Sequence, residues 1–299
     1  MFESKLLVAA IVGKPNVGKS TLMNRFIGEN LAIISPKPQT TRNRIMGVLT
    51  VEELQYLFLD TPGFHKPKNR LGDRMRRSII DSLDDVDVIL FVTYPKEDLD
   101  AIEIELLNMV KARETPFLLV INKSDIAKDK EKLGLWEKGI SKRYGFFESY
   151  SVSALNGENV DSLFDGLEKF AKEGPHLFDE DALTDQPEQF IVAEIMREKL
   201  LNNLREELPH GCAVYVEAMK KREKSDIIDI STVIVCEKKS HKGMIIGKGG
   251  QQLKKVASQA RADIEEFLDN RVNLSCWVKV KEDWRNNETA INEYFQGFN

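Results

Sequence analysis

Continuous apolar runs separated by helix-like patterns fill the first 170 residues of the chain. Strands are expected at residues 6–12, 45–51, 55–59, 86–92, 116–121 and 148–152. Apolar spacing predicts helices between them, at residues 21–27, 71–83, 102–110 and 160–170. Strands that alternate with helices predict an α/β fold, with a mostly parallel sheet covered by helices on both faces. A ligand of such a sheet binds at the carboxyl ends of its strands.

The pattern changes in the second part of the chain, where alternating strands replace the continuous runs. Residues 193–208 carry apolar side chains at three- and four-residue spacing and predict a helix. Alternation predicts strands at residues 212–218, 228–236 and 272–280, with a helix, a glycine loop and a longer helix between the last two. The resulting order, α-β-β-α-α-β, predicts an α+β domain.

An acidic, turn-prone stretch without periodicity separates the two patterns, and we interpret residues 174–189 as a linker. We therefore expect a first domain at residues 1–173, a second at 190–285 and a tail at 286–299. Two domains suit a chain of 299 residues.

The net charge of −5 is unevenly distributed. Residues 188–299 hold 18 Lys/Arg and 18 Asp/Glu, which leaves 25 and 30 for the first part, so any basic patch must be local.

No apolar run approaches the ~18–20 residues of a membrane span, and the start of the chain does not look like a signal peptide. Cys212, Cys236 and Cys276 are far apart and odd in number, which favours reduced cysteines in a cytoplasmic protein, expected to be a monomer.

A glycine loop follows the first predicted strand and fits the pattern G-x-x-x-x-G-K-[ST], the phosphate-binding P-loop. Its residues are Gly13, Lys14, Pro15, Asn16, Val17, Gly18, Lys19 and Ser20, followed by Thr21 at the start of a helix. The glycines allow the backbone to approach phosphates, and the helix N-terminus points N–H groups at them. Lys19 would neutralise phosphate charge and Ser20 would bind Mg²⁺. The alternative is a glycine turn that binds nothing.

Two further segments complete the predicted phosphate and metal site. Within the irregular stretch 34–44 we choose Thr41, rather than Thr40, as the threonine that meets Mg²⁺ and the γ-phosphate. The strand at 55–59 is followed by Asp60, Thr61, Pro62, Gly63 and Phe64. Asp60 would hold Mg²⁺ through water, and Gly63 could place its N–H against the γ-phosphate. The expected metal ligands are thus Ser20, Thr41 and Asp60, and the expected catalytic residues are Lys19, Thr41 and Gly63.

The strand at 116–121 leads into a segment that selects a base, namely Asn122, Lys123, Ser124 and Asp125. Guanine presents two donors on one edge, and the Asp125 carboxylate can accept both, whereas adenine offers no such pair. Asn122 would brace the loop and the Lys123 stem would lie over the base. The last strand leads into Ser153, Ala154 and Leu155, where the Ala154 N–H could donate to guanine O6.

The second domain carries a G-x-x-G loop between its two adjacent helices, in an order that resembles a type II KH domain. Such loops bind about four nucleotides of single-stranded nucleic acid. Residues 238–261 contain seven Lys/Arg and no Asp or Glu. The expected RNA-binding residues are Lys242, Ile246, Gly247, Lys248, Gly249, Gly250, Lys254 and Lys255. For Trp277, on the polar face of the last strand, we expect packing against a neighbouring element in preference to base stacking.

The order of these motifs resembles the translation-factor-class GTPases, and the stretch Pro38-Gln39-Thr40-Thr41-Arg42-Asn43-Arg44-Ile45, together with the C-terminal half, resembles the Era-like subfamily. The resemblance covers nearly the whole chain. It implies a GTP/GDP switch that binds single-stranded rRNA, at the 3′ end of small-subunit rRNA, on a small-subunit precursor. It also implies peripheral contact with the inner face of the cell membrane, although the sequence has no lipid anchor or amphipathic basic helix. Asn16 is a candidate K⁺ ligand, and this question stays open.

One departure from the small signalling GTPases bears on catalysis. They place a water-orienting glutamine where this chain has Phe64, and the adjacent His65 is a weak substitute. We therefore expect slow hydrolysis. Two other functions remain as alternatives: a P-loop kinase or ATPase, which Asn122 and Asp125 argue against, and an RNA-binding scaffold with a structural nucleotide and no significant turnover.

Overall fold

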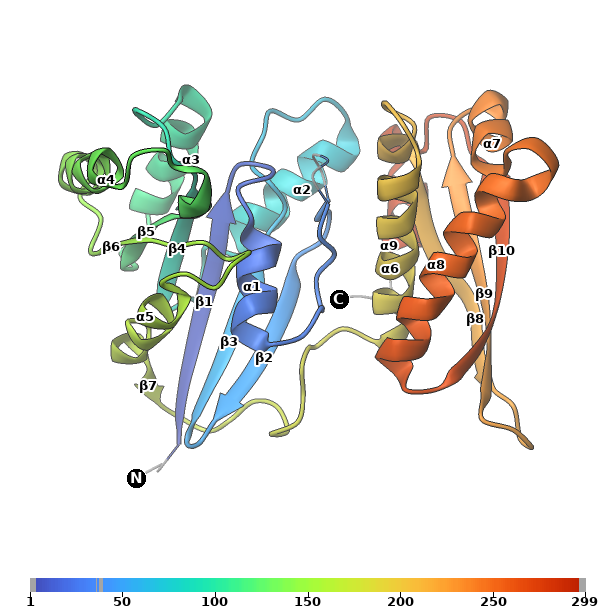
Figure 1. The fold of residues 1–299 in the computed structure, drawn as a ribbon, viewed down its shortest axis with the longest axis horizontal. Coiled ribbons are helices and arrows are strands. Elements are labelled where there is room, and N and C mark those ends of the chain that lie inside the picture. Colours follow the sequence, from blue (N-terminus) through green and yellow to red (C-terminus); the bar gives the residue numbers. More distant parts are fainter. Residues whose placement is uncertain (1–3, 36, 38–39, 296–299) are drawn as a thin grey trace. The chain divides into compact units, whose positions relative to one another are not determined.

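The apolar runs of the first part of the chain form one sheet in the computed structural model, which describes residues 4–35, 37 and 40–295. The strands lie in the order β2-β3-β1-β4-β5-β6, and β7 pairs with β1. The pairs β2–β3 and β1–β7 are antiparallel and the others are parallel (Figure 1). Their bounds are β1 Lys5–Gly13, β2 Ile45–Val51, β3 Leu54–Asp60, β4 Val88–Thr93, β5 Phe117–Ile121, β6 Ser149–Ser151 and β7 Lys172–Glu173. The predicted mostly parallel sheet is confirmed.

Helices cover both faces of this sheet. They are α1 Lys19–Ile27, α2 Arg70–Asp81, α3 Ala101–Lys111, α4 Lys130–Tyr144 and α5 Val160–Asp165. One apolar cluster joins α2, α3 and α4 to inward-facing strand residues such as Phe91 and Ile121. On the other face, Phe58 of β3 meets Phe26 of α1 and Phe164 of α5. The helix expected at 160–170 is shorter, because α5 ends at Asp165 and a separate 3-10 turn, Glu168–Phe170, follows.

The segment predicted as a linker is attached to the outer strand β2 for part of its length. The Val48 N–H donates to Leu183 O at 2.8 Å, and the Thr184 hydroxyl donates to Met46 O at 2.6 Å. Further along, the fully buried Gln55 side chain accepts from the N–H groups of Leu177 and Phe178 and donates to Phe178 O. This part of the predicted linker is therefore bonded to the edge of the first sheet rather than exposed along its whole length.

The second unit has its own three-stranded sheet, in the order β10-β9-β8. β8 Ala213–Lys221 and β9 Ile227–Cys236 are antiparallel, whereas β10 Arg271–Val280 runs parallel to β9. Its helices are α6 Glu188–Asn203, α7 Lys239–Ile246, α8 Gln251–Leu268 and α9 Glu288–Phe295. The predicted order α-β-β-α-α-β is confirmed, although α6 ends before the expected residue 208.

The described part of the predicted tail, residues 286–295, packs on the second unit together with Trp284 just before it. Trp284 is fully buried and donates its indole N–H to Gly211 O at 2.9 Å. In α9, Tyr294 stacks on Tyr215 of β8 with ring centroids 5.5 Å apart. The chain thus consists of two compact units, which divide after Asp185. Among the described residues, none of the helices combines the length and apolarity needed to cross a membrane.

Candidate functional site

The P-loop connects the end of β1 to the start of α1, at the carboxyl edge of the parallel strands. Gly18 precedes α1 with a left-handed φ of 93°, and a Cβ there would collide with the Asn122 amide. The Lys19 ammonium contacts two loop carbonyls, Gly13 O at 3.2 Å and Lys14 O at 3.0 Å. Burial lowers the pKa of Lys19 to about 8, against the opposing effect of Asp60. The ammonium is thus buried at the place where phosphates would bind.

Three oxygen-bearing side chains meet beside this lysine. The Ser20 hydroxyl donates to Asp60 Oδ2 at 2.6 Å and lies 2.9 Å from the Thr41 hydroxyl, which donates to the same carboxylate oxygen at 3.3 Å. Thr40 instead donates to Lys37 O at 2.6 Å. Pro38 and Gln39, which also carried the resemblance, lie outside the described residues.

Asp60 has the character of a cation ligand. Its side chain is fully buried, and Oδ1 has no hydrogen-bond partner among the described residues. Burial raises the pKa of Asp60 to about 6, although Lys19, Ser20 and Thr41 act in the opposite direction. An unpaired buried carboxylate oxygen beside two hydroxyls suits Mg²⁺, which prefers oxygen ligands. The residues present therefore fit the metal that the P-loop implies.

The phosphate pocket also includes residues that sequence reasoning missed. Its lining residues are Pro15, Asn16, Gly18, Lys19, Ser20, Thr21, Ile33, Ile34, Ser35, Thr40, Thr41 and Gly63. Ile33 and Ile34 gave no chemical signal, and only their place at the start of the irregular stretch 34–44 could have indicated them. Gly63 closes the pocket, where an added Cβ would lie 2.6–2.7 Å from Pro15 atoms. Any side chain at this position would displace the P-loop.

Phe64 was included among the nucleotide-binding residues, but its side chain lies in the apolar core. It is 1% exposed, belongs to the cluster beneath α2 and α3, and has the Arg76 guanidinium 5.3 Å from its ring centroid. Its N–H donates to Gly13 O at 3.0 Å. Thr61 is also a buried structural residue, because its hydroxyl donates to Ile11 O at 2.8 Å. The physical reason is common to both: the chain after β3 continues over the core before it reaches the surface.

The base-reading segments form one network with the P-loop. The Asn122 amide donates to Val17 O and accepts from the Ala154 N–H, both at 2.9 Å. The Lys123 ammonium donates to Asn16 O at 2.6 Å. Asn122 and Lys123 therefore hold the P-loop. The Ala154 N–H, which we expected to donate to guanine O6, donates to Asn122 instead, so a bound base would have to share this donor.

Asp125, the residue predicted to accept from guanine, lies beside the segment that follows β6. Asp125 Oδ1 accepts from the Ser153 hydroxyl at 2.6 Å, so Ser153 orients the carboxylate. Leu155, also among the predicted residues, is 76% exposed. Its side chain could only cover a base from the solvent side.

The glycine loop of the second unit lies between α7 and α8. Gly247 and Gly249 have left-handed φ values of 74° and 58°. A Cβ on Gly247 would lie 2.6 Å from Gln252 Cβ, whereas Gly249 faces open space. Lys248 is exposed and Ile246 is half-buried. The backbone at Gly249 is thus accessible to a polymer that approaches closely.

Seven exposed cations lie on this loop and on the two helices that it joins, and we call them the basic surface: Lys238, Lys239, Lys242, Lys248, Lys254, Lys255 and Arg261. None of them forms an ion pair with another residue in the described part of the chain. Trp277 on β10 is 61% exposed, so the expectation that it packs against a neighbouring element was wrong. Ser275 and Lys279, two positions away on β10, are polar and exposed.

Comparison with known proteins supplies independent findings. Residues 8–123 match the family model of the 50S ribosome-binding GTPase, and residues 207–285 match that of the KH domain. The GTPase Era of Clostridioides difficile is 46% identical over 299 residues, which cover 100% of this chain and 99% of the relative. The GTPase Era of Alkaliphilus metalliredigens is 50% identical over 285 residues, 94% of this chain and 95% of the relative.

Two solved structures match nearly the whole chain, each with a TM-score of 0.94 and 38% identity. One is a variant of Era from Aquifex aeolicus bound to GDP·AlF4−, covering 97% of this chain and 99% of that one. The other is Era in complex with MgGDPNP and nucleotides 1506–1542 of 16S ribosomal RNA, covering 98% and 99%.

Proposed function

The chain belongs to the GTPase Era family, and from that premise we propose that it is a GTP-controlled switch that binds the 3′ end of small-subunit rRNA during assembly of the small ribosomal subunit. Its enzymatic reaction is hydrolysis of GTP to GDP and phosphate. The single observation that supports RNA binding best is the basic surface around the Gly247–Gly250 loop. Seven cations without ion-pair partners would otherwise repel one another, and a phosphate backbone would neutralise them.

The nucleotide site suggests a role for each of its residues. Lys19 would exchange its contacts with Gly13 O and Lys14 O for the phosphates, and Asp125 would accept from guanine. Ser20 and Thr41 would bind Mg²⁺ directly and Asp60 through water, and the metal would neutralise charge on the phosphates. We propose further that Asn16, on the exposed turn of the P-loop, contributes to a K⁺ site.

Slow intrinsic turnover follows from the position of Phe64. A water-orienting group must reach the attacking water, but the Phe64 side chain is buried in the core and has no polar atom. The remaining groups, Lys19, Thr41 and the Gly63 N–H, would stabilise charge without activating the water. The alternative function, an RNA scaffold with a structural nucleotide, predicts no turnover even when RNA is present.

The choice of RNA comes from the relative that was solved with nucleotides 1506–1542 of 16S rRNA, a component of the small subunit. The name of the matching GTPase family model refers instead to the 50S subunit. We favour the small subunit because the 16S complex was solved for a relative that matches this chain over both domains. We also propose that the protein acts as a cytoplasmic monomer with peripheral membrane contact.

The decisive variant replaces Lys248 and Gly249 with aspartates. Carboxylates in the loop would repel the RNA backbone, and the side chain at position 249 would obstruct it. We expect loss of binding to a single-stranded RNA of the 16S 3′ end, with GDP affinity nearly unchanged. For residual binding, the slope of log affinity against log salt should fall by ~0.7 for each lost phosphate contact.

A charge-matched control carries Lys220→Asp and Ser225→Asp, two exposed positions at the β8–β9 hairpin. It changes the net charge by the same amount and should keep most of the RNA affinity. A folded, GDP-binding loop variant that retains RNA affinity and salt slope would contradict the proposed RNA site. Measurement of GTP turnover by the unmodified protein, with and without the RNA, separates the switch from the scaffold.

A further inference from the structure

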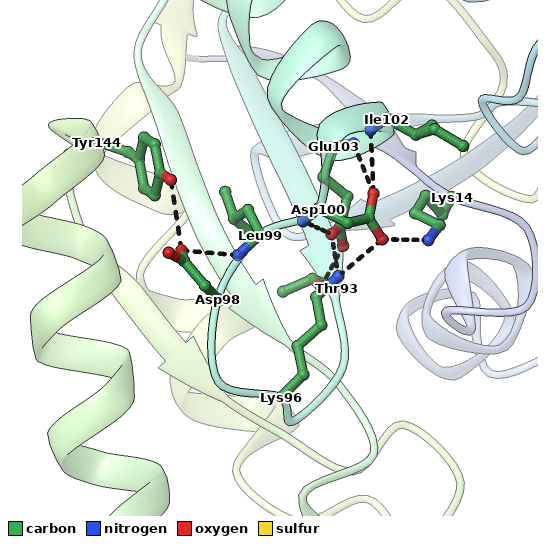
Figure 2. Close-up of polar contacts among 9 residues, drawn as sticks. All are labelled: Lys14, Thr93, Lys96, Asp98, Leu99, Asp100, Ile102, Glu103 and Tyr144. Atoms are coloured by element: carbon green, nitrogen blue, oxygen red, sulfur yellow. Dashed lines mark hydrogen bonds and ion pairs between the residues drawn. The ribbon is translucent and has the colours of Figure 1, made fainter.

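A charged cluster joins the P-loop to the beginning of α3 (Figure 2). The Lys14 ammonium forms an ion pair and hydrogen bond with Asp100 Oδ2, 86 residues along the chain. Asp100 is the N-cap of α3, and the Lys14 and Asp100 side chains are 22% and 41% exposed. Asp100 belongs to none of the motifs that contact phosphate or base, and Lys14 occupies one of the variable positions of the P-loop, so the motif itself does not require the pair.

The Asp100 side chain is held in one position and serves as an anchor for Lys14, because both of its carboxylate oxygens accept hydrogen bonds. Oδ1 accepts from the N–H groups of Ile102 at 3.0 Å and Glu103 at 3.2 Å, and Oδ2 also faces the Lys96 ammonium at 3.3 Å. The Glu103 side chain is fully buried and accepts from Thr93 Oγ1 at 2.7 Å and from the Asp100 N–H at 2.9 Å. Thr93 ends β4, so the anchor is attached to the central sheet.

The backbone of Lys14 contacts Lys19, the lysine of the P-loop motif. The Lys14 carbonyl accepts from Lys19 Nζ at 3.0 Å, beside the Gly13 carbonyl at 3.2 Å. Gly13 O is itself fixed by the Phe64 N–H at 3.0 Å. The Phe64 N–H therefore fixes the carbonyl of Gly13. Within the described part of the chain no such bond fixes the Lys14 carbonyl, and its position depends on the ion pair between the Lys14 side chain and Asp100.

We propose that Lys14 and Asp100 are positioning residues for nucleotide binding, which hold the first half of the P-loop so that Lys19 and the loop N–H groups are preorganised for phosphates. The inference rests on the proposed function, since it concerns the same GTP site. It assigns to α3 a part in nucleotide affinity, although no residue of α3 belongs to the site described above.

The charges support this assignment. Burial lowers the pKa of Lys14, but the hydrogen bond and charge of Asp100 outweigh it and raise the pKa above 10.5, so the pair stays ionised at neutral pH. Removal of the Asp100 carboxylate can also show which role the residue has, because the two possible roles predict opposite changes in nucleotide affinity. Removal of a carboxylate near a phosphate site should strengthen anion binding by simple electrostatics, whereas loss of an anchor should weaken it.

The test measures the Kd of a fluorescent GDP analogue, with Mg²⁺, for Lys14→Met, Asp100→Asn and the double variant. Asparagine still caps α3 through its side-chain oxygen but carries no charge for Lys14. A partly exposed ion pair is worth up to about 1 kcal/mol, so each single variant should bind about fivefold more weakly. The double variant should also lose about fivefold rather than about 25-fold, because both changes remove one interaction.

Two controls separate this effect from general damage. Asp98→Asn makes the same charge change two residues earlier, where the carboxylate contacts Tyr144 and the Leu99 N–H (Figure 2) and also Arg143. It does not contact the P-loop, so the GDP affinity of this variant should match that of the unmodified protein. Lys14→Arg keeps a cation and should recover most of the affinity. Thermal unfolding without nucleotide should be similar for all variants.

Other outcomes would overturn the inference. If Asp100→Asn tightens GDP binding while Lys14→Met weakens it, Lys14 binds phosphate directly and Asp100 competes for it. If the losses multiply, or follow a drop in melting temperature, the residues act separately or structurally. If the unmodified protein fails to bind GDP, the proposed function fails, whereas normal binding by every variant refutes only the positioning role.

Discussion

At the scale of single residues, Asp60 combines full burial with an oxygen that has no partner. Its pKa of about 6 lies above the value of roughly 3.9 for an unfolded chain. Because the pKa is raised, the fold favours the neutral form of Asp60, and this contribution to the free energy of unfolding is fully present below about pH 4. The contribution is lost as the pH rises through about 6 and the buried carboxyl ionises. Without a metal, the protein should therefore become less stable as Asp60 ionises.

We expect Asp60→Asn to stabilise the protein in EDTA at pH 7, by on the order of 2 kcal/mol, and to have a clearly smaller effect at pH 4.5. Urea unfolding of both proteins at the two pH values measures this difference. Mg²⁺ with GDP should reverse the order at pH 7, because only the unmodified carboxylate suits the cation. An equal difference at both pH values would show that Asp60 ionises normally in the fold.

A second prediction concerns Phe64, the position where signalling GTPases have glutamine. Phe64→Gln should not accelerate GTP turnover, because the side chain points into the core rather than towards the phosphates. It should lower the free energy of unfolding by about 3 kcal/mol, since an amide would replace a packed ring. Phe64→Leu is the matched control and should lose less. A large rate gain in Phe64→Gln would show that the residue can swing into the site.

Residues of the local motifs were predictable because strand, glycine loop and helix are adjacent in the chain. The contact between Lys14 and Asp100 was not predictable, since 86 residues separate them, Lys14 occupies a variable position of the P-loop and Asp100 belongs to no motif. Phe64 was assigned to the nucleotide because it follows Gly63, but adjacency in sequence does not fix the direction of a side chain. Burial of its ring decided that direction.

At the scale of elements, the edge of the first sheet depends on one buried amide. We expect Gln55→Leu to keep the volume but leave the backbone groups of Leu177 and Phe178 without their partner. The cost should be about 2 kcal/mol, with faster proteolysis between residues 174 and 185. Limited proteolysis and thermal unfolding measure both effects. Gln251→Leu, at an exposed position of α8, is the control and should change neither.

The elements that sequence patterns missed had weak signals for physical reasons. In α4 only Leu133 and Ile140 are buried, seven positions apart, so the helix shows little apolar periodicity. The attachment of Leu183 and Thr184 to β2 uses backbone and hydroxyl groups, which leave no hydrophobic pattern. The short helix α9 did carry a signal, because Ala290, Ile291 and Tyr294 recur at helical spacing. The strands with continuous apolar runs were predicted well because burial on both faces dictates their composition.

At the scale of the whole molecule, two compact units carry two kinds of site. Mg²⁺ and GDP should stabilise the first unit, and RNA of the 16S 3′ end the second. Ligand at 100 times its Kd contributes about 2.7 kcal/mol, which shifts the melting temperature by roughly 5–10 °C for the first unit and by more for the smaller second unit. Calorimetry should thus show two transitions, each raised by one ligand.

The loop variant with aspartates at Lys248 and Gly249 tests this division. It should lose the shift caused by RNA and keep the shift caused by GDP. A single transition that both ligands raise equally would show that the two units unfold as one cooperative body. That outcome would indicate that contacts beyond each core govern stability.

The basic surface also determines how the protein behaves during purification. With an isoelectric point of about 5.6, the chain should be retained by an anion exchanger at neutral pH, yet its uncompensated lysines should also retain it on heparin. Cellular RNA fragments would remain bound at low ionic strength and raise the absorbance at 260 nm. Because six to ten phosphate contacts lose ~10³–10⁵ in affinity between 50 and 200 mM salt, a high-salt wash should remove these fragments. The absorbance ratio before and after that wash would report whether the RNA site was occupied in the cell extract.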